Sequence, residues 1–167
     1  MYGGTDIIRC FTVEATMRFL HTWLLVTAVL KSASTRTLSY EDCGSTVQIK
    51  SVKMKPCKLS PCELTKLGND TIQIKFQTDS DAGSPGDSGF YGTFQGTTFP
   101  FFVERPKICD NIKPHCPLKP SSRYTYKNTV STSEAYPNVH LTGRWVLNNT
   151  EGKPMVCVQF PIQIVEK

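Results

Sequence analysis

The sequence predicts an all-β fold, a sandwich of about seven antiparallel strands, and three observations support this prediction. Short runs of alternating apolar and polar residues recur along the chain. Clusters rich in Gly, Pro, Asn, Asp and Ser, such as 80–89, 119–122 and 148–154, separate these runs. No segment after residue 34 keeps a helical apolar spacing over the length of a helix. Short strands at this spacing are typical of an immunoglobulin-like β-sandwich.

The first 34 residues are set apart from this fold. Met17 and Arg18 precede a 12-residue apolar run, and small residues follow at 32–34. That layout is typical of a secretory signal peptide, and the run is shorter than the roughly 20 residues that a membrane span needs. We therefore expect an upstream extension at 1–16, a signal peptide at 17–34 and one folded domain at 35–167.

The first three expected strands occupy residues 47–55, 71–78 and 90–94. In the first of them the alternation slips between Ile49 and Val52, which predicts a β-bulge. The second and third each place their isoleucines and phenylalanines on one face, as a strand with one buried face requires.

The other expected strands occupy residues 123–130, 139–147 and 156–165, and the turn clusters at 119–122, 135–138 and 148–154 delimit them. No repeat, linker or low-complexity segment divides this part of the chain, so we expect a single domain.

Six of the seven cysteines follow the expected signal peptide, and Cys10 precedes it. An even number of cysteines in an exported chain indicates a disulfide framework, although six cysteines allow 15 pairings. Spacing favours an arrangement that closes two short proline-containing loops and joins the two ends of the domain: Cys57–Cys62, Cys109–Cys116 and Cys43–Cys157. No metal site is expected, because the spacing is not CxxC and His115 and His140 are typical of surface residues.

No motif supports an enzyme. Gly86–Gly89 reads GDSG, a sequence found in chymotrypsin-type proteases, but the chain lacks the accompanying histidine motif and is too short for two barrels. We expect a flexible turn there. GxSxG, P-loop and HExxH motifs are also absent, so we expect no catalytic residues and no cofactor.

The charge pattern suggests a soluble exported protein. From residue 35 onward there are 16 Lys and Arg against 12 Asp and Glu, and four lysines (50, 53, 55 and 58) interleave with Val52 and Met54. These lysines indicate a solvated strand face, with weak attraction to anionic membranes as the functional alternative. Nucleic acid is not expected as a partner. Asn69 and Asn148 begin N-x-Thr sequons and are candidate glycosylation sites.

An aromatic-rich segment, residues 92–102, contains four phenylalanines, more than a solvated loop would carry: Phe94, Phe99, Phe101 and Phe102. Pro100 lies among them and has no amide hydrogen to donate to a sheet. We therefore expect no central strand to continue through it.

Phe99, Phe101, Tyr136 and Trp145 fit two interpretations. In the first, which composition alone favours, they fill an ordinary core. In the second, the two sheets lie further apart than the usual spacing of about 10 Å, and these residues line the cavity between them. Phe101 and Tyr136 each adjoin a proline at the end of an expected strand. That position indicates the rim of a cavity.

Six segments carry a resemblance to a known family: YEDCGS (40–45), KPCKLSPCEL (55–64), FPFFVERPKIC (99–109), HCPLKPSSRYTYKN (115–128), EAYPNVHLTGRW (134–145) and VCVQFPIQIV (156–165). They resemble the ML (MD-2-related lipid-recognition) family, and most closely its Niemann-Pick type C2 branch of soluble sterol carriers. Cys116-Pro117 and, twenty residues later, Tyr136-Pro137 are specific coincidences with this branch.

The resemblance implies an immunoglobulin-like sandwich with a hydrophobic cavity between its sheets and the three disulfides given above. In the sterol-carrying branch, an aromatic ring at the place of Phe101 and the pair corresponding to Tyr136-Pro137 form the pocket mouth. Thr132 stands where an aliphatic rim residue is common. The deeper ligand-binding positions correspond to Leu64, Ile72, Phe90, Phe99, Leu141, Trp145 and Ile162.

This sequence also departs from the branch it resembles. Gly143 replaces a bulky inward residue, Phe102 a proline and Asp70 an aromatic residue. These departures predict a wider or more polar pocket.

The function implied by the resemblance is that of a secreted or lysosomal monomer. It binds a sterol or similar lipid and transfers it between membranes or to a receptor, with transient contact to anionic membrane surfaces. Phe101 and Tyr136 are expected to act as gates. The phenylalanines of 92–102 are expected to form one wall of the cavity, with the Cys109–Cys116 loop at its far end.

Two alternatives remain open. One is an innate-immune subunit that recognises microbial glycolipid, with Arg105, Lys107 and Lys113 near the aromatic-rich segment as cationic partners of the ligand. The other is an immunoglobulin-like adhesion or allergen-type module with a closed core.

Overall fold

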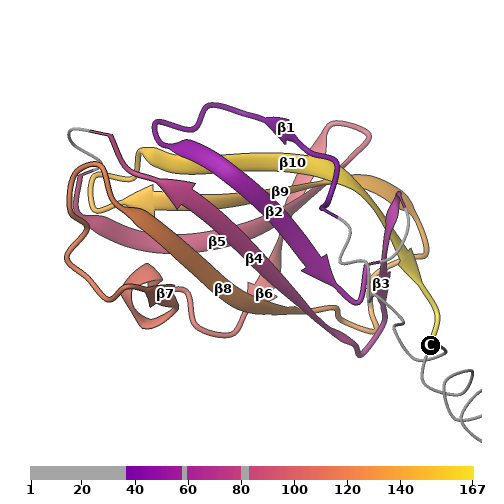
Figure 1. The fold of residues 1–167 in the computed structure, drawn as a ribbon. Coiled ribbons are helices and arrows are strands. Elements are labelled where there is room, and N and C mark those ends of the chain that lie inside the picture. The colour runs from indigo at the N-terminus through magenta and orange to yellow at the C-terminus, as the bar shows by residue number, and fades with distance from the viewer. Residues whose placement is uncertain (1–36, 58–59, 80–82) are drawn as a thin grey trace, which may run out of the picture. The chain divides into compact units, whose positions relative to one another are not determined.

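The computed structural model describes residues 37–57, 60–79 and 83–167, which belong to the compact unit Thr35–Lys167. The expected extension, the expected signal peptide and Cys10 lie outside the described residues. Within these ranges the chain forms ten strands and a 3-10 helix (Figure 1): β1 (Glu41–Asp42), β2 (Gln48–Lys55), β3 (Cys62–Thr65), β4 (Asn69–Gln77), β5 (Pro85–Phe94), β6 (Thr97–Val103), η1 (Ile108–Asp110), β7 (Ile112–Lys113), β8 (Arg123–Ser131), β9 (His140–Asn149) and β10 (Pro154–Val165).

The strands form two layers that share one strand. Hydrogen bonding runs in the order β1-β10-β9-β5-β6-β8-β4-β2, with β3 also paired to β10 and β7 to β8. In Figure 1, β2, β4 and β8 lie in front of β5, β9 and β10. Strand β6 pairs with β5 over most of its length and with β8 through Phe102 and Val103. The prediction of an all-β sandwich is confirmed.

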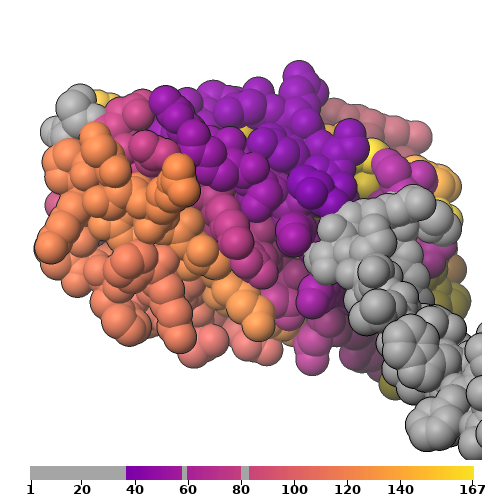
Figure 2. Space-filling view, in the orientation of Figure 1, coloured from indigo at the N-terminus to yellow at the C-terminus, as the bar shows by residue number. Residues whose placement is uncertain are grey.

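The front layer faces the viewer in Figure 2, where indigo, magenta and orange atoms lie side by side. Lys50 and Lys55 are exposed on β2, whereas Val52 and Met54 point inward and are buried. The register of β2 against β4 shifts between Ile49 and Ser51, which confirms the predicted bulge.

The GDSG motif does not form the expected flexible turn. Gly86–Gly89 belongs to β5, and Ser88 pairs with Leu147 of β9. The amide and the hydroxyl of Ser88 both donate to the carbonyl oxygen of Pro106, at 2.7 and 2.8 Å. These bonds hold the segment in the sheet, and the turn-forming residues are accommodated by a register shift between Pro85 and Ser88.

Strand β6 continues through Pro100, contrary to the sequence-based prediction. Pro100 pairs with Tyr91 of β5 on one side, and pairing with β8 on the other side starts only at Phe102. Proline is tolerated where a strand has an unpaired edge, because no ladder hydrogen bond is lost there. The strand therefore crosses between the layers without interruption.

Two further features differ from the expectation of about seven antiparallel strands. The structure has additional short strands, and β3 runs parallel to β10, with Ile162 opposite Cys62. The disulfides follow the arrangement that spacing favours: Cys43–Cys157, Cys57–Cys62 and Cys109–Cys116.

Candidate functional site

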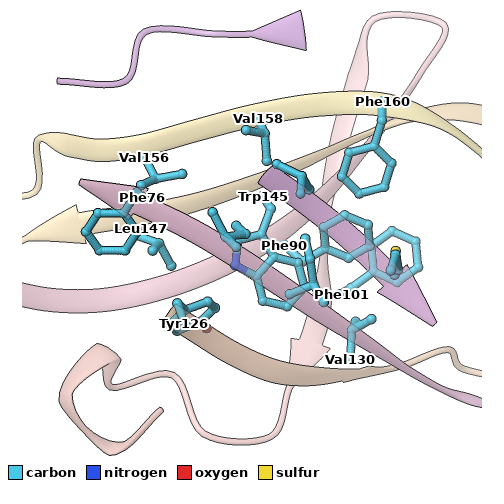
Figure 3. Close-up of a cluster of buried hydrophobic side chains, with 14 of the residues drawn as sticks. Phe76, Phe90, Phe101, Tyr126, Val130, Trp145, Leu147, Val156, Val158 and Phe160 are labelled. Carbon is cyan, nitrogen blue, oxygen red and sulfur yellow. The ribbon is translucent and has the colours of Figure 1, made fainter. Parts of the chain in front are cut away.

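A cluster of aromatic side chains occupies the space between the layers. The ring of Phe90 on β5 lies 4.9 Å from Phe101, 5.1 Å from Trp145 and 6.0 Å from Phe160, measured between ring centroids. All four side chains are buried. Figure 3 shows them among side chains from both layers, including Tyr126 of β8. Alternation along β5, β6, β9 and β10 turns these residues to the inner face.

The cluster reaches the surface through Tyr136. The Tyr136 ring lies edge-on to the ring of Phe101, with 5.1 Å between the ring centroids. Its centroid lies 5.5 Å from that of Phe99. Its hydroxyl donates to the carbonyl oxygen of Pro100 at 3.0 Å. Tyr136 is half-buried and Pro137 is exposed. The aromatic contacts therefore run from the loop between β8 and β9 to the centre of the sandwich.

Two glycines face each other beneath these rings. Gly92 of β5 pairs with Gly143 of β9. A Cβ atom at Gly92 would lie 2.8 Å from a ring carbon of Phe101, and one at Gly143 would lie 3.0 Å from a ring carbon of Phe90 and 3.1 Å from Ile162. Phe90 and Ile162 thus occupy the space beside Gly143. The glycine therefore does not widen the pocket at this position, contrary to the prediction.

Polar side chains also lie on this inner face. Asp70 of β4 and Thr132, directly after β8, are buried. Burial raises the pKa of the Asp70 carboxyl to about 6. Thr132 Oγ1 has no hydrogen-bond partner within the described part of the chain.

The structure brings the candidate ligand-binding residues together. Those that are buried come from both layers: Leu64, Ile72, Phe90, Phe101, Thr132, Leu141, Trp145 and Ile162. Phe99 and Tyr136 pack against this core. Their role in binding a ligand, and the cavity they are expected to line, stay predictions. Asp70 was noted only as a departure from the family, and Gly92 was not singled out.

The expectation that four phenylalanines form one wall needs correction. Phe99 and Phe101 point inward, but Phe94 and Phe102 are exposed. Alternation along β6 explains the difference, because Phe101 and Phe102 are adjacent and must point to opposite faces. Phe101 and Tyr136 were both expected at strand ends. Phe101 instead lies within β6, and Tyr136 lies in the loop between β8 and β9.

Of the basic residues proposed to bind a glycolipid, Lys113 lies far from Tyr136 along β8, and Arg105 lies nearer to it. Lys113 of β7 pairs with Thr125 of β8, six positions from Ser131, which corresponds to roughly 20 Å along the strand. The Arg105 carbonyl accepts a hydrogen bond from Asn128, in the middle of β8. The Cys109–Cys116 loop, which carries β7, also lies along this part of β8.

One surface hollow, of about 510 Å³, is lined by Asp87, Lys107, Asn148 and neighbouring residues. Another is lined by Tyr40, Gln159, Phe160 and their neighbours.

Of the candidate glycosylation sites, Asn69 is exposed and Asn148 half-buried. Modification at either asparagine stays a prediction.

The described ranges 37–57, 60–79 and 83–167 contain no helix long and apolar enough to cross a membrane. They also contain no group of three or more His, Cys, Asp and Glu side chains arranged to hold a metal ion.

Residues 37–164 match the family model described as the ML domain. The chain belongs to the ML domain family. It is 30% identical to mouse NPC intracellular cholesterol transporter 2 over 149 residues, which cover 89% of this chain and 99% of the mouse protein. It is 31% identical to the ecdysteroid-regulated 16 kDa protein of Manduca sexta over 145 residues, 85% of this chain and 97% of that protein.

A solved structure is similar as well. The crystal structure of a Niemann-Pick type C2 protein from the Japanese carpenter ant superposes with a TM-score of 0.64 at 25% sequence identity. The match covers 77% of this ML-domain chain and 100% of the ant protein. The predicted relationship to Niemann-Pick type C2 proteins is therefore confirmed.

Proposed function

We propose that this protein carries a sterol or similar lipid between its two β-layers and transfers it between membranes or to a receptor. The observation that supports this most directly is the series of ring contacts from Tyr136 at the surface, through Phe101, to Phe90 and Trp145 inside. Such a series gives an apolar ligand a route lined largely by aromatic rings. The mouse relative named as a cholesterol transporter supports the same class of ligand.

Binding requires the rings at the mouth to move. Phe101 is 5% exposed, so Phe101 and Tyr136 act as gates that a lipid must displace. A lipid that loses about 400 Å² of apolar surface gains on the order of 10 kcal/mol before the costs of association. No covalent bond is made or broken, and the protein acts as a carrier rather than as an enzyme.

Apolar side chains beside the mouth support contact with a membrane or a receptor. Leu67 and Phe102 are 65% and 66% exposed. Leu67 donates its amide hydrogen to the carbonyl oxygen of Thr132, and Phe102 pairs with Ser131, so both flank the same end of β8. We propose that a monomer exported to the extracellular space or the lysosomal lumen docks through this end.

The glycolipid alternative has weaker support. A receptor subunit for an anionic glycolipid needs cationic side chains where the headgroup emerges. Lys113 lies opposite Thr125, far along β8 from Tyr136's loop. The position of Lys113 therefore favours the carrier over the immune subunit.

A displacement titration tests the proposed function. Protein expressed from the full chain is titrated with a fluorescent sterol, and co-purifying lipids are extracted and identified by mass spectrometry. We expect saturable one-to-one binding, weakened at least tenfold by Phe101→Ala or Tyr136→Ala. Phe94→Ala is the matched control, because Phe94 is exposed at the β5–β6 turn. Folded protein that binds no sterol or fatty acid and yields no lipid would refute the proposal and favour the closed-core module.

A further inference from the structure

Two polar side chains, both from the end of the β4–β8 pair, are buried in the largely apolar interior. Asp70 and Thr132 are each only 2% exposed. Thr132 Oγ1 has no hydrogen-bond partner in the described ranges. Burial raises the pKa of the Asp70 carboxyl to about 6. Buried polar groups are normally paired, so each of these calls for an explanation.

The strand register places the two side chains side by side. Asp70 lies opposite Val130 in the β4–β8 ladder. The ladder continues one step past the strand end, because the amide of Thr132 donates to the carbonyl oxygen of Gly68 at 3.2 Å. Asp70 and Thr132 are therefore diagonal neighbours on the inner face, whose Cβ atoms are about 7 Å apart in such an arrangement. One small polar group can contact both.

This pair adjoins the aromatic mouth. Phe102 pairs with Ser131 and Val103 with Val130, so the same register brings Phe101 opposite Thr132. The ring of Phe101 in turn contacts Tyr136. A lipid that passes these rings meets the Asp70 carboxyl and the Thr132 hydroxyl beside a lining that is mostly aromatic and aliphatic.

We propose that Asp70 and Thr132 form a polar subsite that binds a hydroxyl group of the lipid and selects lipid alcohols over hydrocarbons and fatty acids. A hydroxyl donates to the Asp70 carboxylate and accepts from the Thr132 hydroxyl, so it satisfies both groups at once. A hydrocarbon leaves both unpaired, and a carboxylate is repelled by the ionised Asp70. This inference rests on the proposed function and specifies its ligand class.

The test compares ligands that differ only in the polar group. Protein from the full chain is titrated at pH 7.5 with cholesterol, with cholest-5-ene, which lacks the hydroxyl, with oleyl alcohol and with oleic acid. We expect cholesterol to bind at least tenfold more tightly than cholest-5-ene, and oleyl alcohol at least tenfold more tightly than oleic acid. The reason is that a site built around a hydroxyl discriminates strongly against analogues that lack it. Thr132→Val and Asp70→Asn should each reduce the ratio of cholesterol to cholest-5-ene affinity about fivefold or more.

Matched variants separate the loss of the hydroxyl from a general disturbance of the fold. Thr132→Ser keeps the hydroxyl and should keep the alcohol preference. Thr129→Val makes the same substitution three positions earlier on β8, where the side chain points outward and contacts Thr71, and it should behave as the parent protein does. Circular dichroism and thermal unfolding verify that each variant is folded.

The outcomes distinguish this inference from the proposed function. If the parent protein binds cholesterol and cholest-5-ene and Thr132→Val leaves the ratio of the two affinities unchanged, the subsite is refuted and the carrier function stands. If the folded parent protein binds none of the four lipids, both are refuted. A ratio that falls in Thr132→Val and recovers in Thr132→Ser supports the subsite.

Discussion

Tyr136 donates a hydrogen bond of 3.0 Å to the carbonyl oxygen of Pro100 and thereby fastens the β8–β9 loop to β6. The ring of Tyr136 also rests edge-on against Phe101 at 5.1 Å. One hydrogen bond and one set of ring contacts thus hold Tyr136 against β6. The two can be removed separately by mutation.

Tyr136→Phe keeps the ring and removes only the hydrogen bond. A hydrogen bond of this kind contributes about 0.5–1.5 kcal/mol, so we expect release of a fluorescent sterol to accelerate about twofold to tenfold. Stopped-flow measurement of release into acceptor vesicles gives the rate. Tyr136→Ala should accelerate release further, because it also removes the ring. Equal release rates for Tyr136→Phe and the parent protein would show that the bond does not control opening.

Phe101→Ala should destabilise the fold as well as weaken binding. Phe101 is buried and contacts Phe90, Phe99 and Tyr136, and truncation of a buried phenylalanine costs about 3–5 kcal/mol. Phe94, which is 36% exposed, should lose less than about 1 kcal/mol on truncation. Urea unfolding of both variants measures the difference. A loss below 1 kcal/mol for Phe101→Ala would mean that this ring is not packed as described.

Asp70 should make stability depend on pH. Its pKa is raised from 3.8 to about 6 in the folded protein, so between these values the unfolded state ionises first. The free energy of unfolding attributable to Asp70 therefore falls as pH rises from about 4 to 6, by about 3 kcal/mol at 1.36 kcal/mol per unit, and then levels off.

Asp70→Asn cannot ionise and should not show this fall. Urea unfolding of the parent protein and the variant at pH 4, 5, 6 and 7 isolates the effect as the difference between their curves. We expect Asp70→Asn to gain stability relative to the parent as pH rises. A constant difference across this range would contradict the raised pKa.

The disulfides should contribute unequally. Cys43 and Cys157 are 114 positions apart, and in the chain-entropy model closing so long a loop stabilises the fold by about 4–5 kcal/mol. Cys57 and Cys62 are 5 positions apart, for which the same model gives about 2 kcal/mol. Paired Cys→Ser variants, compared by urea unfolding, measure each contribution. A larger loss for the short loop would exclude chain entropy as the main cause.

The strands and the two short disulfide loops could be predicted because they depend on local signals, and Cys43 and Cys157 then remained as the third pair. Alternation revealed the inner faces, and it revealed the bulge between Ile49 and Val52 where it slipped. The prediction of a turn at GDSG was wrong because its residue types favour turns. The carbonyl oxygen of Pro106, distant in sequence, accepts the hydrogen bond that holds Ser88 in a strand. The prediction that no strand continues through Pro100 was wrong for a similar reason. A proline interrupts a strand only where a neighbouring strand needs its amide hydrogen, and β8 pairs with β6 only from Phe102 onward.

The polar subsite was only half predictable. Asp70 lies in phase with Ile72, Ile74 and Phe76, so alternation alone places it on the inner face. Its proximity to Thr132 depends on the register between β4 and β8. No pattern within either strand specifies that register, which arises from packing of the whole sandwich.

The two layers are connected along both long sides. Strand β6 belongs to each of them on one side. On the other, the Cys57–Cys62 disulfide links the end of β2 to β3, which pairs with β10. Connections on both sides oppose any increase in the spacing of the sheets, so a guest molecule must gain its volume from rotation of aromatic side chains. Ring signals in a nuclear magnetic resonance spectrum should then respond to loading far more than backbone amides do.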